Sequence, residues 1–214
     1  MRVFLDFDGT VVNVFRRYHA LLTDFWGDCV SLEDYVVLKR QKPHDRQLLQ
    51  TLLQFSDDEF SRYLRFKREK METRDYLTKD ELNINPSLLR DFFDQFDMSV
   101  LSVRRSARSA HDQYADLGLE FLVETADILP PAGSATKRSW IERSHSEPFV
   151  MIGDSEVDMA AGSLTNGKGF FVENGLRSIV TIPAKIRPCS VFPNIEAALS
   201  ALNPDQPSDT HRSE

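Results

Sequence analysis

The sequence contains little cysteine, no excess of positive charge and no long apolar run. Cys29 and Cys189 are its two cysteines, and neither belongs to a Cys-x-x-Cys pair, which argues against a disulfide framework or a zinc site. The net charge of -7 argues against binding nucleic acid or an anionic membrane through a general positive field. No apolar stretch reaches the roughly 18 residues that a bilayer-spanning helix needs.

A secretion signal is also missing from the pattern of the first residues. Met1 to Phe7 run directly into an apolar strand, which leaves no place for a charged segment, an apolar segment and a cleavage site. We therefore expect a cytoplasmic protein. With 41% hydrophobic residues the chain of 214 residues can bury a substantial core, in one domain or one domain with an insertion. No pattern indicates an oligomeric state.

Secondary-structure signals change twice along the chain. Residues 3–7 are typical of a buried strand that stops at the Asp8-Gly9-Thr10 turn. Residues 14–96 have apolar side chains at three- and four-residue spacing, which indicates helices and no convincing strand. From residue 97 onward, strands expected at 98–103, 120–123, 149–152 and 169–172 alternate with helices expected at 107–117, 137–143 and 157–164, before a closing helix at 195–202. Residues 203–214 contain two prolines and few apolar residues, and are expected to be disordered.

This order predicts an α/β fold with a parallel sheet. The sheet core would comprise residues 1–13 and 97–202, and residues 14–96 would form an inserted all-helical cap. Ligands of such sheets bind beyond the carboxyl ends of the strands. Because the insertion starts just after the first strand ends, we expect the cap to overhang that site.

Two carboxylates stand at the end of the first predicted strand. Asp6 and Asp8 are two residues apart, so their side chains share one face and can act on one centre. One carboxylate can attack phosphorus, while its neighbour, if its pKa is suitable, protonates the leaving oxygen and later deprotonates water. Gly9 permits the sharp turn that follows.

Further polar residues stand at other strand and helix ends. A carboxylate can approach an anionic phosphate only if positive charge intervenes, and Mg²⁺ held by Asp6 and Asp154 would supply it. Lys137 would add a fixed positive charge, and Ser102 a hydrogen-bond donor, to the phosphoryl oxygens. Gly9, Thr10, Val103 and Arg104 adjoin these positions and are candidate contacts to phosphate or substrate.

These motifs resemble those of the haloacid dehalogenase-like superfamily. Asp6-Phe7-Asp8-Gly9-Thr10 resembles its first motif, and Gly153-Asp154 with Asp158 resembles its fourth. Ser102 and Lys137 resemble the second and third motifs. The helical insertion resembles the family's cap in position only.

The resemblance implies a Rossmann-like core and an aspartyl phosphate formed on Asp6. It also implies magnesium held by Asp6, the main-chain carbonyl of Asp8, and Asp154. Asp158 would either support the metal site or orient Lys137. The presence of Asp8 indicates the phosphatase branch, because the dehalogenase branch lacks that aspartate.

Several assignments stay open at this point. Bulky and basic residues follow Ser102, so Ser99 or Ser106 could instead supply the hydroxyl, and Lys168 is a less favoured alternative to Lys137. Basic residues of the insertion could contact an anion, but such runs are usually solvated faces, which is the favoured interpretation. They are Arg16, Arg17, Lys39, Arg40, Lys42 and Arg46.

The sequence therefore predicts a Mg²⁺-dependent phosphatase of a small phosphorylated metabolite, without nucleic acid or membrane as partner. Two alternatives remain. A phosphomutase or phosphotransferase would use the same aspartyl phosphate, and a non-catalytic regulatory protein would bind a phosphorylated ligand on the same fold.

Overall fold

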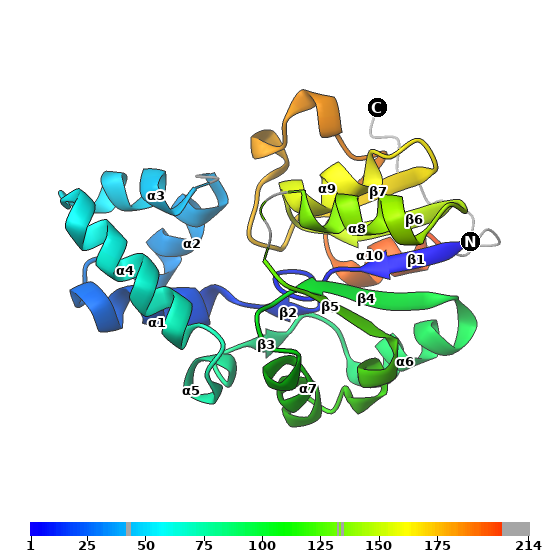
Figure 1. Ribbon diagram of the computed structural model, residues 1–214, viewed down its shortest axis with the longest axis horizontal. Coiled ribbons are helices and arrows are strands. Elements are labelled where there is room, and N and C mark those ends of the chain that lie inside the picture. The colour runs from blue at the N-terminus through cyan, green and yellow to red at the C-terminus, as the bar shows by residue number, and fades with distance from the viewer. Residues whose placement is uncertain (42–43, 132, 134, 203–214) are drawn as a thin grey trace, which may run out of the picture.

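The computed structural model describes residues 1–41, 44–131, 133 and 135–202. They form a six-stranded sheet with helices on both faces, and a separate group of helices beside the sheet (Figure 1). The expected disordered tail, 203–214, lies outside the described residues, as does Lys42. Among the described helices, none is long and apolar enough to cross a membrane.

The sheet has the strand order β5-β4-β1-β6-β7-β8, and every neighbouring pair is parallel. Its strands are β1 (Arg2–Leu5), β4 (Met98–Val103), β5 (Ala126–Leu129), β6 (Phe149–Gly153), β7 (Gly167–Val172) and β8 (Ser190–Phe192). Strand β6 is buried along its whole length, as expected for a central parallel strand covered on both faces. The α/β fold with a parallel, Rossmann-like sheet that the sequence predicted is confirmed.

Helices cover the sheet. They are α6 (Pro86–Gln95), α7 (Ala107–Asp116), α8 (Thr136–Ser144), α9 (Glu156–Gly162) and α10 (Ile195–Ser200). Of these, α7, α8 and α9 form crossover connections between the parallel strands. Short 3₁₀ turns occur at Glu120–Thr125, Ile179–Thr181 and Ala184–Ile186. Leu89 and Phe92 of α6 are buried in the same core cluster as Val3 and Val100 of the sheet. Helix α6 therefore packs with the sheet although it lies within 14–96, and the exact boundaries of core and cap stay a prediction.

The remaining helices form the cap group, which we define as α1 to α4 with the short helix α5. They are α1 (Phe15–Trp26), α2 (Leu32–Gln41), α3 (Asp45–Leu52), α4 (Asp57–Lys70) and α5 (Arg74–Leu77). The group has an apolar cluster of its own, including Leu22, Leu49 and Tyr63. Helix α4 begins at a capping box in which Ser56 and Glu59 each accept a hydrogen bond from the other's backbone N–H.

Two short strands join the cap group to the sheet. Strands β2 (Val12–Asn13) and β3 (Glu81–Leu82) pair antiparallel, with Val12 opposite Leu82, so the chain leaves and returns side by side (Figure 1). The sequence indicated only helices in 14–96, and β3 is an exception. A two-residue strand is too short to produce a period-two pattern.

Residues 120–123, expected as a strand, form a 3₁₀ turn that leads into β5. Their apolar residues suggested a strand. In the structure these residues are apolar because Leu122 is fully buried and Phe121 packs against the core cluster, although neither belongs to the sheet. Strand β8 was not expected, because its three residues at the sheet edge carry no strong pattern.

Candidate active site

Asp6 lies at the centre of the carboxyl edge of the sheet. It follows β1, whose Leu5 pairs with Val100 of β4 on one side and Ile152 of β6 on the other. This register brings residues that follow β4 and β6 to the same edge as Asp6. Asp6 itself is only 6% exposed.

The turn after Asp6 requires glycine. Gly9 has φ of +95°, and a Cβ there would lie 2.4 Å from a carboxylate oxygen of Asp154. Thr10 lies beyond it, with its hydroxyl 3.4 Å from Asp6 and 3.5 Å from Asp154. Gly9 and Thr10 thus bring the ends of β1 and β6 together.

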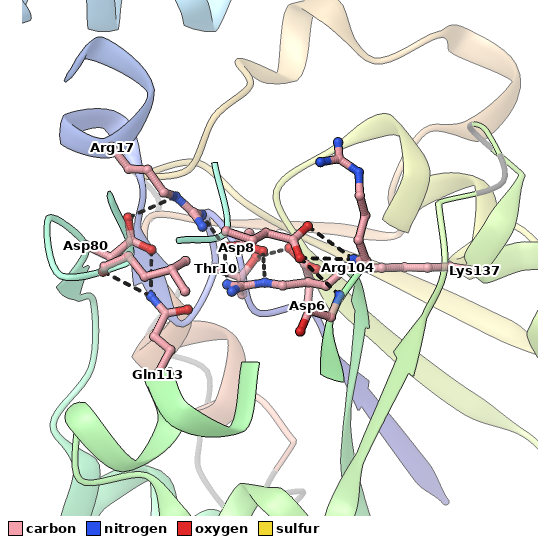
Figure 2. Close-up of polar contacts among 12 residues, drawn as sticks. Asp6, Asp8, Thr10, Arg17, Asp80, Arg104, Gln113 and Lys137 are labelled. Carbon is pink, nitrogen blue, oxygen red and sulfur yellow. Dashed lines mark hydrogen bonds and ion pairs between the residues drawn. The ribbon is translucent and has the colours of Figure 1, made fainter. Parts of the chain in front are cut away.

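Lys137, near the start of α8, connects two of the acids. Its Nζ forms an ion pair with Oδ1 of Asp6 (Figure 2). A second ion pair, at 2.6 Å, joins it to Oδ1 of Asp158. Burial lowers the pKa of Lys137, but Asp158 and Asp6 outweigh this and raise it above its ordinary value. Lys137 is therefore a fixed cation beside the candidate nucleophile.

Asp158 has both carboxylate oxygens engaged. Oδ1 accepts from Lys137, and Oδ2 accepts from the hydroxyl of Ser155 at 2.6 Å and from its backbone N–H at 3.1 Å. Of the two roles that the sequence left open, this arrangement favours orienting Lys137 over binding a metal. It also caps the start of α9.

Three buried acids offer oxygen atoms within 4.8 Å of one another, namely Asp6, Asp154 and Asp158. Burial, followed by the charge of Asp158, raises the pKa of Asp6 well above its usual range, and the same causes raise the pKa of Asp154 to about 7. Such a cluster of buried like charges is stabilised by a cation. Hard oxygen ligands from two carboxylates, with room for substrate oxygens, fit Mg²⁺.

Ser102, the penultimate residue of β4, lies beside this cluster. Its side chain is buried, and its hydroxyl has no hydrogen-bond partner among the residues that the structure describes. Of the alternatives, Ser106 caps α7 by accepting from the N–H of Ser109, and Ser99 does not line the cavity. Lys168, the alternative to Lys137, is exposed on β7. The geometry thus favours Ser102 and Lys137.

Asp8 is clamped by two arginines (Figure 2). Arg104 binds both of its oxygens, from Nε at 2.8 Å and from Nη2 at 2.7 Å, and Nη2 of Arg17 pairs with the same carboxylate. Burial raises the pKa of Asp8, but Arg104 and then Arg17 outweigh it and hold that pKa at about 2. In this arrangement Asp8 is ionised, so it must be released from the arginines before it can donate a proton.

Arg17 comes from the cap group, and the expectation that it lies on a solvated face is wrong. It is 1% exposed, and Lys39 is also buried, whereas Arg16 and Arg46 are exposed as expected. Arg17 lies four residues before the buried Leu21 on α1, so it shares the inward face of that helix. That spacing was the signal in the sequence that could have placed it.

Asp80 pairs with Arg17, and Gln113 in turn hydrogen-bonds to Asp80. Nε of Arg17 lies 3.2 Å from Oδ1 of Asp80, and Gln113 donates to Oδ2 of Asp80 at 2.8 Å (Figure 2). Gln113 also donates to the carbonyl of Leu77 at 3.3 Å. Burial raises the pKa of Asp80 to about 7. Sequence reasoning did not identify Asp80 or Gln113, because neither belongs to a motif and the two are 33 residues apart.

A single cavity of about 190 Å³ brings most of these groups together. The ends of the strands and helix α8 contribute candidates from all four motifs, and the cap group contributes Arg17 and Tyr18. The candidates on its wall are Asp6, Asp8, Ser102, Val103, Arg104, Lys137 and Asp154. Gly9, Thr10 and Asp158 do not line the cavity. Gly9 and Thr10 lie close to Asp154, and Asp158 pairs with Lys137. The cap group therefore overhangs the carboxyl edge of the sheet.

The sequence matches no protein-family model and no curated protein. Solved structures do match. A haloacid dehalogenase-like family hydrolase from Streptococcus pneumoniae has a TM-score of 0.72 at 16% identity, covering 94% of this chain and 98% of its own. Protein tyrosine kinase A from Mycobacterium tuberculosis has a TM-score of 0.68 at 16% identity, covering 94% and 97%.

A protein described as a predicted phosphatase from Clostridium acetobutylicum has a TM-score of 0.65 at 15% identity, covering 94% of this chain and 97% of its own. These likenesses extend over the cap group as well as the sheet, since each covers nearly the whole chain. At such low identity they establish the fold. The chain has the fold of the haloacid dehalogenase-like hydrolases.

Proposed function

We propose that the protein is a Mg²⁺-dependent phosphatase that hydrolyses a small phosphomonoester through an aspartyl phosphate on Asp6. The observation that carries this proposal is the position of Asp6. It is buried, paired with Lys137 and close to Asp154, and it shares one cavity with the hydroxyl of Ser102, which has no hydrogen-bond partner among the described residues. Neighbours described as hydrolases and phosphatases support the same reaction class.

In the first step, an oxygen of Asp6 attacks phosphorus and the bond from phosphorus to the leaving alcohol oxygen breaks. Lys137 and Ser102 donate to the phosphoryl oxygens, where charge shifts in the transition state. Asp8, once protonated and released from its arginines, gives a proton to the leaving oxygen.

In the second step, Asp8 removes a proton from water, which attacks phosphorus and displaces the carboxylate of Asp6. Inorganic phosphate leaves, Asp6 is again a free carboxylate, and Asp8 holds the proton taken from water, ready to protonate the next leaving oxygen. Mg²⁺ bound by Asp6 and Asp154, with the main-chain carbonyl of Asp8 as the third proposed ligand, would offset repulsion between carboxylate and phosphate.

Phosphate release from an aryl phosphate and a panel of small phosphomonoesters tests this function. We expect release by the wild type that depends on Mg²⁺ and is lost in Asp6→Asn. Asp112→Asn is the matched control, because Asp112 is 69% exposed and should leave release unchanged.

Other outcomes would point to the alternatives. Transfer of phosphate to an added sugar hydroxyl, without release, would indicate a phosphotransferase or phosphomutase. Binding of phosphorylated ligands by a folded wild type that turns over no substrate would indicate a regulatory protein.

A further inference from the structure

In the clamp around Asp8, two buried guanidinium groups share one carboxylate. Arg17 and Arg104 both pair with the one carboxylate of Asp8, and each guanidinium side chain is only 2% exposed. Arg17 has a second partner in Asp80, but burial shifts that carboxyl toward its neutral form. Buried guanidinium groups are stable only when they are paired, so the clamp has unused capacity for an anion.

Arg104 has an unused donor in the same place. Its Nε and Nη2 contact Asp8, whereas its buried Nη1 has no hydrogen-bond partner among the described residues. Arg104 lines the cavity that contains Asp6 and Lys137. An unpaired buried donor beside a cavity is a binding site that lacks its acceptor.

The two arginines come from different parts of the molecule. Arg104 follows β4 of the sheet, and Arg17 lies on α1 of the cap group, with Asp8 between them (Figure 2). Glu72, the acidic residue that the cap group adds to this cavity, accepts hydrogen bonds from the backbone N–H groups of Arg105 and Ser106 at 3.1 Å. Its charge is therefore already partly satisfied.

We propose that Arg17 and Arg104 bind a second anionic group of the substrate, which takes the place of Asp8 on these guanidinium groups while the phosphoryl group lies at Asp6. This inference rests on the proposed function and narrows its substrate to a phosphomonoester with a carboxylate or a second phosphate. Binding releases Asp8 for its part in the reaction, so a substrate without the second anion leaves Asp8 clamped for most of the time and reacts more slowly.

The contact that Arg104 makes with Asp8 is a model for the bound anion. Two parallel N–H donors hold two carboxylate oxygens, a geometry that suits a carboxylate and also a phosphate. The cavity of about 190 Å³ is smaller than the roughly 300–1,000 Å³ of pockets for drug-sized ligands. This volume suits a small substrate with a short link between its two anionic groups.

Matched substrates test the inference. The probes share one short carbon chain with a phosphate ester at one end, and carry at the other end a carboxylate, its primary amide, or a second phosphate. For the wild type with Mg²⁺ we expect kcat/KM for one of the anionic probes to exceed that for the amide at least about tenfold. The anionic probe with the higher kcat/KM shows whether the second anion is a carboxylate or a phosphate. Equal kcat/KM for all three probes would overturn the inference.

Variants then assign the preference to the two arginines. Arg17→Lys and Arg104→Lys keep the positive charge but lose the paired donors, so the ratio of kcat/KM between the anionic probe and the amide should fall toward one. Arg16→Lys is the control, because Arg16 is the exposed neighbour of Arg17 and pairs with Glu81 at 3.1 Å. An unchanged ratio in both clamp variants, with circular dichroism showing that they fold, would contradict the assignment.

A binding measurement separates this inference from the proposed function. Calorimetry with Asp6→Asn, Mg²⁺ and the intact probes needs no turnover, and should show tighter binding of the anionic probe than of the amide. If the wild type hydrolyses none of the probes and the binding preference is still seen, the second-anion site is supported and the proposed phosphatase activity is wrong. If all probes are hydrolysed equally well, the phosphatase stands and the second-anion site is wrong.

Discussion

At the scale of single residues, buried charges dominate the candidate site. Asp6, Asp154 and Asp158 are nearly or fully buried, and Lys137 is the cation that Asp6 and Asp158 share. Removing one member of such a set leaves the others uncompensated, which destabilises a protein more than the intact set stabilises it. Lys137 therefore has a structural role in addition to the chemical role proposed for it.

Lys137→Met should destabilise the protein by about 3 kcal/mol without Mg²⁺, because Asp6 and Asp158 lose their shared cation. Urea unfolding measures this effect, and Mg²⁺ should restore part of the loss by binding Asp6, the one of these two acids that is a proposed metal ligand. Lys168→Met at the exposed end of β7 is the control. A stability equal to that of the control variant would show that Lys137 is not needed to compensate these acids.

Asp80 makes stability depend on pH. Burial raises its folded-state pKa to about 7 from 3.8, so between pH 4 and 7 the folded protein keeps a proton that the unfolded chain has lost. The stability of the wild type relative to Asp80→Asn should therefore fall as pH rises through this window, by up to about 1.4 kcal/mol per pH unit.

Urea unfolding of both proteins at several pH values checks this difference. The other buried acids titrate in both proteins and largely cancel. A difference that stays constant from pH 4 to 7 would mean that Asp80 has an ordinary pKa.

Sequence motifs located Asp6, Asp8, Lys137 and Asp154 because local signals surround each one, a strand end followed by a turn or a helix start. Asp80 and Gln113 carry no such signal. Asp80 contacts Arg17, and Gln113 contacts Asp80, only because the chain folds back to this place after the cap group. Contacts between residues so far apart depend on packing, which composition and spacing do not encode.

At the scale of elements, the long periodic segments were predictable and the short ones were not. The strand expected at 98–103 is β4, and the helix expected at 107–117 matches α7 within a residue. Strands β3 and β8, of two and three residues, were missed, and residues 120–123 were assigned to the wrong element. Neighbouring elements, more than local propensity, decide the structure of such short segments.

The start of α7 depends on a residue of the cap group. Glu72, between α4 and α5, accepts from the N–H groups of Ser106, the N-cap residue of α7, and of Arg105 just before it. Glu72→Gln should speed hydrogen exchange at these amides and cost about 1 kcal/mol of stability. Glu69→Gln, at an exposed position on α4, is the control, and equal exchange in the two variants would show that Glu72 does not hold the helix start.

At the scale of the whole molecule, the cap group and the sheet meet over the carboxyl edge where the chemistry would occur (Figure 1). Arg17 of α1 pairs with Asp8, and the backbone carbonyl of Arg40 in α2 accepts a hydrogen bond from the N–H of Ser178 at 3.1 Å. The order of the motifs along the chain predicted this arrangement, because an insertion after the first strand must leave and return at that edge. The pairing of Arg17 with Asp8 required the folded structure.

The most direct measurement is a rapid acid quench of the protein with an aryl phosphate and Mg²⁺, followed by mass analysis of the peptide that contains Asp6. We expect a phosphoryl group on that peptide in the wild type, and neither the phosphoryl group nor phosphate release in Asp6→Asn. Phosphate release at the wild-type rate by folded Asp6→Asn would contradict the assignment of Asp6 as the nucleophile.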